Sequence, residues 1–252
     1  MTPDIGIEVM LGLGVTLVLA GFVKGTIGFG LPLVALSVLT QLLPKEWALS
    51  LMVLPVVVSN LFIGLHGELF RPTLQRFWPL ILAVGCGILV GAWWLGSMPQ
   101  ADFLLLTGLV VIAVVLLDSF KLVLPVPAHH ERAVGLGAGL CGGLLGGIST
   151  AFGPPLILYF TALRLPKDQF VAAIGVVWTF SSLFLVAAFQ GSGVLNGERF
   201  LWSLGACIPV GIGLWLGIRL RGRIPQTPFR RLVAVALILL GLNMVRRGLL
   251  GN

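Results

Sequence analysis

The chain has 252 residues, of which 58% are hydrophobic and only 10% are charged, and its mean hydropathy is +1.07. A soluble domain carries about 25% charged residues, so this composition excludes an ordinary soluble domain and predicts an all-α polytopic membrane protein. The net charge of +7 does not point to nucleic acid, because five arginines gather between two apolar regions, in Arg219–Arg231, as is typical of a cytoplasmic loop.

In chain order, charged and turn residues divide the sequence into eight apolar regions, at about 5–43, 47–65, 77–97, 103–120, 133–163, 170–190, 200–218 and 229–245. A membrane-spanning helix needs roughly 20 residues, and six regions have about this length. The first and fifth are too long, because Val9–Leu43 and Ala133–Leu163 would measure roughly 50 Å and 46 Å as straight helices at 1.5 Å per residue. We expect each of them to break or to fold back.

Both long regions carry break signals at matching places. The first contains Gly25, Gly28, Gly30 and Pro32, and the fifth contains glycines followed by Pro154 and Pro155. Most glycines of the fifth region are predicted to be close-packing surfaces between helices: Gly135, Gly137, Gly139, Gly142, Gly143, Gly146 and Gly147.

Four segments recur in the same order along the chain. They are FGLPLV and FGPPLI, LPKEW and LPKDQ, HGELF and NGERF, and GAWWLGSMPQADF and GIRLRGRIPQTPF. We therefore predict two homologous repeats of about four transmembrane regions each, residues 1–125 and 133–252, connected by a loop at 121–133. Such duplication is a common origin of transporter folds.

The distribution of loop cations favours inverted repeats. If each long region crosses the membrane once, the loop cations divide almost evenly between the two sides. If each long region folds back as a re-entrant hairpin, one side keeps only Lys45, Arg199, Arg246 and Arg247. The second distribution obeys the positive-inside rule and places both termini outside. Five tryptophans near region ends are predicted to form an interfacial belt: Trp47, Trp78, Trp93, Trp94 and Trp202.

The breaks predict an anion site near the membrane midplane. Non-helical backbone at that depth must face protein or water, and the half-helix that starts after each break directs free N–H groups and a positive dipole end inward. Lys24 adds a cation, although a lysine near a helix end can also snorkel to the headgroups. Asn60 can instead bond a neighbouring helix, and Trp178 can simply pack. The candidate substrate-binding residues are Lys24, Thr26, Gly28, Gly30, Asn60, Ser149, Thr150, Gly153 and Trp178.

Catalytic and metal chemistry are not expected. Cys86, Cys141 and Cys207 lie far apart without metal-ligand spacing, and the three histidines fall in predicted loops, where none can serve a nucleophile as base. There is no Walker A sequence. We expect no enzyme activity, no cofactor and no metal.

The pattern GFVKGTIGFG with a following proline, its echo FGPPLILY and the segment LPKEWAL resemble the sulfite exporter TauE/SafE family of bacterial membrane transporters. The resemblance implies a multi-pass inner-membrane protein that exports sulfite, sulfoacetate or another organosulfonate. A passive anion channel and a transporter of small non-sulfur carboxylates remain alternatives. Coupling to protons or to another ion, with Lys24 as a candidate proton carrier, stays open, as does the oligomeric state.

Overall fold

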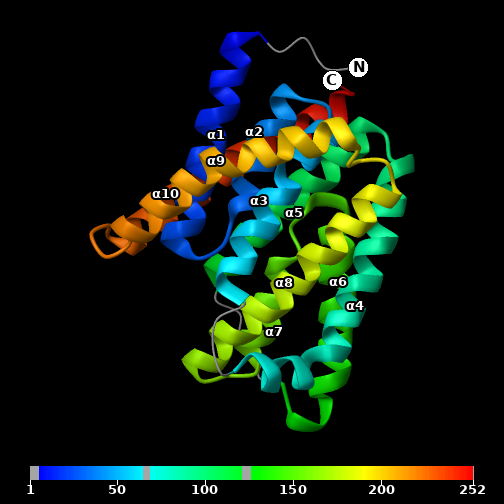
Figure 1. The fold of residues 1–252 in the computed structure, drawn as a ribbon, viewed down its shortest axis with the longest axis vertical. Helices are drawn as coiled ribbons and strands as arrows, with labels where there is room; N and C mark the ends of the chain where they lie inside the picture. Colours follow the sequence, from blue (N-terminus) through cyan, green and yellow to red (C-terminus); the bar gives the residue numbers. More distant parts are fainter. Residues whose placement is uncertain (1–5, 65–68, 121–125, 252) are drawn as a thin grey trace. The chain divides into compact units, whose positions relative to one another are not determined.

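The structure is a computed structural model that describes residues 6–64, 69–120 and 126–251 (Figure 1). Within these ranges the chain forms ten α-helices, one short 3₁₀ helix and no strand. The helices are α1 (Ile7–Ile27), α2 (Leu31–Leu42), α3 (Lys45–Gly64), α4 (Phe70–Ser97), α5 (Gln100–Phe120), α6 (Glu131–Ser149), α7 (Gly153–Ala162), α8 (Lys167–Gly191), α9 (Gly197–Leu220) and α10 (Gln226–Leu250), with the 3₁₀ helix η1 at Ala128–His130.

Every predicted apolar region contains helix, which confirms the all-α prediction for the described residues. Among the residues that the structure describes, seven helices are long and apolar enough to cross a membrane: α1, α4, α5, α6, α8, α9 and α10. The largest boundary error is at α4, which begins at Phe70 rather than near residue 77. Its added first turns are polar, and Arg76 pairs there with Glu131 at 2.9 Å. Hydropathy alone does not detect a helix that continues beyond the apolar core.

Each long region consists of two helices separated by three residues. α1 ends at Gly28, which has a left-handed backbone (φ 99°) and donates its N–H to the Lys24 carbonyl at 2.7 Å. α6 ends in the same way at Thr150, which has φ 58° and donates its N–H to the Gly146 carbonyl at 2.8 Å. A left-handed residue ends a helix because it turns the following chain away from the helix axis.

α7 returns along α6 toward the start of that helix. The Tyr159 hydroxyl donates to the Glu131 carbonyl at 3.1 Å, and Tyr159 lies against Gly135. The Val126 N–H, just before η1, donates to the carbonyl of Ala162, the last residue of α7, at 3.4 Å. The chain therefore leaves this helix pair beside the place where it enters. Whether α7 and α2 re-enter a bilayer stays a prediction.

The helices form two compact units. The first comprises residues 1–55, 98–120 and 196–252, and in it α1 packs on α9, α5 on α10, and α2 on α1 and α10. The second comprises residues 56–97 and 121–195, and in it α4 packs on α6 and α8, with α7 beside α6 (Figure 1). Each unit contains helices from both predicted repeats, so the boundary between the units differs from the boundary between the repeats. The repeats stay a prediction.

Glycines bring the main helix pairs into backbone contact. Gly21, Gly25, Gly213 and Gly217 lie between α1 and α9, and Gly87, Gly91, Gly143 and Gly147 lie between α4 and α6. Packing is confirmed for all the predicted packing glycines of α6 except one. Gly137 is exposed, and a Cβ built on it meets no atom within 4 Å. At about 100° per residue, Gly137 faces away from Gly135 and Gly139.

Candidate functional site

The first break gathers four candidate residues in the first unit. Lys24 is only 4% exposed and lies in the last turn of α1, one turn before Gly28. Gly30 follows with φ 96° and is the N-cap residue of α2. A Cβ on Gly28 would meet nothing within 4 Å, and one on Gly30 only Val23 Cγ1 at 3.6 Å. Glycine is therefore required at these two positions by backbone conformation rather than by lack of space.

The N-terminus of α2 offers backbone donors to a ligand. No side chain caps it, and Pro32 in its first turn has no N–H, so the donors of this turn are Gly30, Leu31 and Leu33. Free N–H groups and the positive end of the helix dipole stabilise an anion. With the ammonium of Lys24 one turn upstream of the break, this end of α2 has the chemistry of an oxyanion site.

Thr26 is fully buried, but its hydroxyl is turned toward its own helix. Oγ1 donates to the Phe22 carbonyl at 2.8 Å. Serine and threonine often bond the carbonyl four residues earlier when they lie inside a helix. In this conformation the hydroxyl proton of Thr26 is engaged by its own helix, and the hydroxyl must rotate before it can donate to an anion.

The far end of α2 is anchored to α10 by a polar network that the sequence reading missed. Arg247 Nη1 donates to the carbonyls of Thr40 and Gln41 at 3.3 Å and 3.4 Å, and Asn243 Nδ2 donates to Gln41 Oε1 at 2.6 Å. An arginine at a helix C-terminus satisfies carbonyls and complements the dipole. The only sequence signal was a glutamine, Gln41, within an apolar region.

The second break has buried hydroxyls in the second unit, also bonded to backbone. Ser149 Oγ donates to the Leu145 carbonyl at 2.8 Å, and Thr150 Oγ1 donates to the Ser149 carbonyl at 2.7 Å. α7 starts without a side-chain cap, and Pro154 and Pro155 remove two of its first-turn donors. The N-terminus of α7 therefore offers fewer N–H groups than that of α2.

Trp178 and Asn60 lie together in the same unit. A Cβ on Gly153 would lie 3.0 Å from Trp178 Cζ2, and the Trp178 and Phe152 rings are edge to face at 6.3 Å. Asn60 Nδ2 donates to the Trp178 carbonyl at 3.4 Å and the Asn60 carbonyl accepts from Thr179 Oγ1 at 3.2 Å. Asn60 thus joins α3 to α8, the alternative considered for it from sequence. A single site formed by both breaks stays a prediction.

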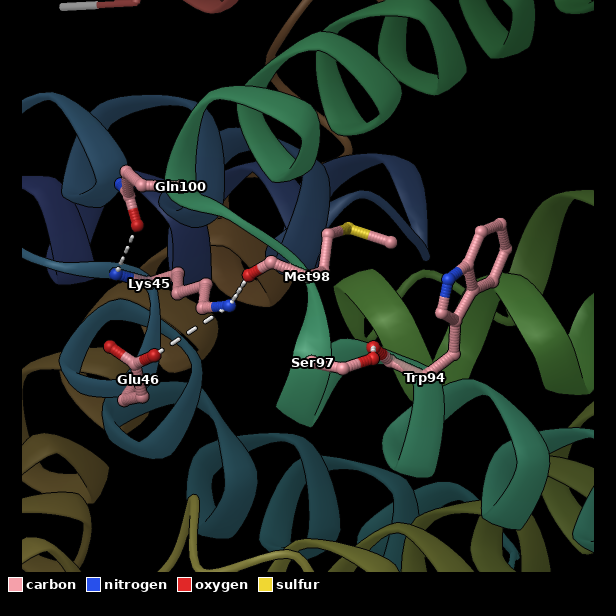
Figure 2. A network of polar contacts seen from close by, with 6 residues as sticks. All are labelled: Lys45, Glu46, Trp94, Ser97, Met98 and Gln100. Carbon is pink, nitrogen blue, oxygen red and sulfur yellow. Dashed lines mark hydrogen bonds and ion pairs between the residues drawn. The ribbon is translucent and has the colours of Figure 1, made fainter.

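A second buried lysine, Lys45, has an internal partner for its charge (Figure 2). Its ammonium donates to the Met98 carbonyl and lies 3.8 Å from Glu46 Oε1, and its backbone N–H donates to Gln100 Oε1 at 3.1 Å. Lys45 fastens the start of α3 to the turn between α4 and α5.

In the part of the chain that the structure describes, no three His, Cys, Asp or Glu side chains are grouped so that they could hold a metal ion.

Comparison with known proteins identifies the family. The sequence model of the family described as "Sulfite exporter TauE/SafE" matches residues 13–244, a range that includes both breaks and every candidate site residue. No protein of curated function and no solved structure matches the chain. The seven long apolar helices agree with the transmembrane character of this family of transporters. The chain is a multi-pass membrane protein and belongs to the sulfite exporter TauE/SafE family.

Proposed function

We propose that the protein is a secondary transporter that exports a small sulfur-containing anion, such as sulfite or sulfoacetate, across the bacterial inner membrane. The family supports transport of this class of anion. The first break supplies suitable chemistry, because it combines a buried ammonium group with the uncapped N-terminus of α2. Sulfite and sulfonates carry charged oxygens that accept hydrogen bonds from both kinds of donor.

The observation that carries this proposal is the burial of Lys24 next to the break. A charged side chain inside a membrane-spanning helix is costly, and such residues mostly face a bundle interior or a watery path. A bound oxyanion offsets part of this cost. Gly28 and Gly30 lack side chains at the turn between Lys24 and α2, so an anion can approach the backbone there. We assign Lys24 as the counter-charge and the first turn of α2 as the hydrogen-bond donor.

We propose that Ser149 and Thr150 contact the anion during transport. Their hydroxyl protons now point to backbone carbonyls. Rotation of the Ser149 hydroxyl would release a donor at low cost, because the Leu145 carbonyl lies within α6 and also accepts a helical N–H. Gly153, Trp178 and Asn60 would then act by shaping this segment, since the indole covers Gly153 and Asn60 bonds the Trp178 carbonyl.

The decisive experiment measures binding and transport in proteoliposomes. Sulfite, sulfate, sulfoacetate, taurine and simple carboxylates are screened with wild type, Lys24→Met and Lys24→Arg. We expect Lys24→Met to weaken binding of the preferred anion by more than about tenfold, the equivalent of 1.4 kcal/mol. Lys24→Arg should keep part of the affinity but change selectivity, because the guanidinium is planar and larger. Unchanged affinity in Lys24→Met would exclude Lys24 from the site.

Lys45→Met provides a matched control for loss of a buried ammonium group. Because Lys45 bonds the Met98 carbonyl, its loss should reduce thermal stability while anion affinity stays within about twofold of wild type. The same liposomes separate a carrier from a channel. Unlabelled anion on the far side accelerates exchange through a carrier, whereas a passive channel shows no such acceleration.

A further inference from the structure

A cavity of about 340 Å³ opens in the first unit between α1, the start of α3 and α9. This volume lies at the lower end of the range for small-molecule pockets, roughly 300–1,000 Å³. Its lining is apolar and includes Met10, Gly14, Leu51, Leu201, Trp202 and Gly205. The cavity lies toward the N-terminal ends of α1 and α9, away from Lys24 and the first break.

Two glycines leave this space open. A Cβ built on Gly14 of α1 or on Gly205 of α9 meets no atom within 4 Å. About two turns further along, at Gly21 and Gly213, the same helices are in backbone contact. Ser203 fastens α3 to α9, since its Oγ accepts the Leu54 N–H at 3.0 Å. The backbone contact of α1 with α9 and the hydrogen bond of α3 to α9 thus hold together the three helices that line the cavity.

The mouth of the cavity lies on an apolar surface. Leu201 is 68% exposed, and Leu204 and Ile208 on the same helix are also exposed. In a multi-pass membrane protein, such a surface of a candidate span faces acyl chains rather than water. Apolar cavities stay free of water and accept apolar guests. In a bilayer, the apolar group available to fill this cavity is the acyl chain of a lipid.

A cation and two aromatic rings adjoin the cavity. The Arg199 guanidinium lies 5.4 Å from the centre of the Trp47 ring, and Trp47 meets Trp202 edge to face at 6.3 Å. Trp202 also lines the cavity. The three side chains therefore connect the cavity to the first turn of α9, where Arg199 lies. Trp47 is buried by these contacts, and its place in an interfacial belt stays a prediction. The neighbouring carboxylate of Glu198 is exposed to solvent.

We propose that this cavity is a binding site for one bilayer phospholipid, with an acyl chain between Gly14 and Gly205 and the phosphate on Arg199. The first turn of a membrane-spanning helix lies at the depth of lipid phosphates, where tryptophans also gather. Guanidinium groups bind phosphate through paired hydrogen bonds. The site is separate from the proposed anion site, so it stands whichever anion the protein transports.

Native mass spectrometry of the detergent-purified protein with added dioleoyl-phosphatidylglycerol tests the proposal. Gly205→Leu places a side chain inside the cavity, while Gly211→Leu adds the same side chain to α9 where a Cβ also meets no atom within 4 Å. We expect one tightly held lipid on wild type and Gly211→Leu, and at least tenfold weaker binding to Gly205→Leu. Equal lipid binding by Gly205→Leu would overturn the site. A change in subunit number with unchanged lipid would assign the cavity to a second copy of the chain and would overturn it too.

Arg199→Gln tests the phosphate contact and does not depend on the tolerance of Gly205 for a larger side chain. Its control is Arg219→Gln, because Arg219 lies over the Trp215 ring at 5.2 Å but at the other end of α9, away from the cavity. We expect lipid affinity to fall about tenfold for Arg199→Gln and to stay unchanged for Arg219→Gln. Equal losses in both variants would show general surface attraction and overturn the proposal.

Discussion

Gly25 of α1 and Gly217 of α9 face each other so closely that a Cβ atom built on either would lie 3.0 Å from the Cα of the other. Gly147 of α6 and Gly91 of α4 form a similar pair, at 2.9 Å and 3.1 Å. Gly25 and Gly147 each lie three residues before the left-handed residue that ends its helix. Each break is thus preceded by a helix fixed to a partner through its backbone.

We expect replacement of Gly25 or Gly147 by alanine to destabilise the protein. A Cβ at Gly25 or Gly147 would press on backbone, which cannot rotate away, and overpacking of this kind costs about 1–3 kcal/mol. Thermal unfolding in detergent and the yield of monodisperse protein measure the loss. Gly211→Ala on α9 and Gly137→Ala on α6 are controls, since a Cβ meets nothing there within 4 Å. Unchanged melting temperatures for Gly25→Ala and Gly147→Ala would refute the close contact.

The sequence allowed the helical regions and the two breaks to be predicted, because glycine, proline and hydropathy act locally. It did not predict that Tyr159 returns to Glu131 or that Arg247 holds the end of α2, since these contacts join segments that have no shared local pattern. Burial of Trp47 was missed for the same reason, because it depends on Arg199 and Trp202.

The sequence repeat also gives only part of the residue-by-residue correspondence between the two breaks. Matching FGLPLV with FGPPLI pairs Gly30 with Gly153. In the structure the breaks have equal length, so Gly28 corresponds to Thr150, and Gly30 to Phe152. Gly153 lies inside the first turn of α7 without a positive φ. Sequence similarity follows residue type, whereas the equivalent position is defined by the left-handed turn.

Thr150 is expected to be strained. A left-handed backbone costs a residue with a Cβ about 1–2 kcal/mol, and a β-branched side chain is especially unusual there. Thr150→Gly should therefore raise the free energy of unfolding by about 1 kcal/mol. Loss of the packing contacts of the Thr150 side chain offsets part of this gain. Thr150→Ala, which keeps the strain and removes the hydroxyl, is the comparison.

Transport assays on the same two variants separate strain from hydroxyl chemistry. If the Thr150 hydroxyl contacts the anion, both variants should transport more slowly, although only Thr150→Gly is more stable. Full transport by Thr150→Gly would remove the hydroxyl from the proposed mechanism.

Arg247 should affect transport through the position of α2. Arg247→Gln removes the donor from the Thr40 and Gln41 carbonyls, which loosens the helix whose other end carries the proposed anion donors. We expect a several-fold higher KM for the transported anion. Its neighbour Arg246 is exposed and donates to Asn243 Oδ1 on its own helix rather than to the α2 carbonyls, so Arg246→Gln is the control. Arg247→Lys should restore part of the affinity, because the ammonium also complements the end of the helix. Equal KM values for Arg247→Gln and Arg246→Gln would refute the positioning role.

The fold-back of α6 and α7 leads to a topology prediction. The Tyr159–Glu131 and Val126–Ala162 bonds place the entry and exit of this helix pair together, so both should lie on one side of the membrane. Single cysteines at the exposed positions Arg132 and Lys167 flank the pair. In a background in which the native cysteines Cys86, Cys141 and Cys207 are replaced, both sites should resist an impermeant maleimide on intact cells and react after permeabilisation.

Cysteines at Gly197 and Gly222 calibrate this measurement, because both are exposed and α9, a candidate span of 24 residues, separates them. The positive-inside rule places the arginine-rich loop at Gly222 inside the cell, so Gly222→Cys should be protected and Gly197→Cys labelled. With that contrast in place, protection of both Arg132→Cys and Lys167→Cys supports inverted repeats, because a fifth region that folds back leaves the second repeat in the opposite orientation to the first. Labelling of only one of them would mean that the region crosses the membrane once, and the repeats would then be parallel.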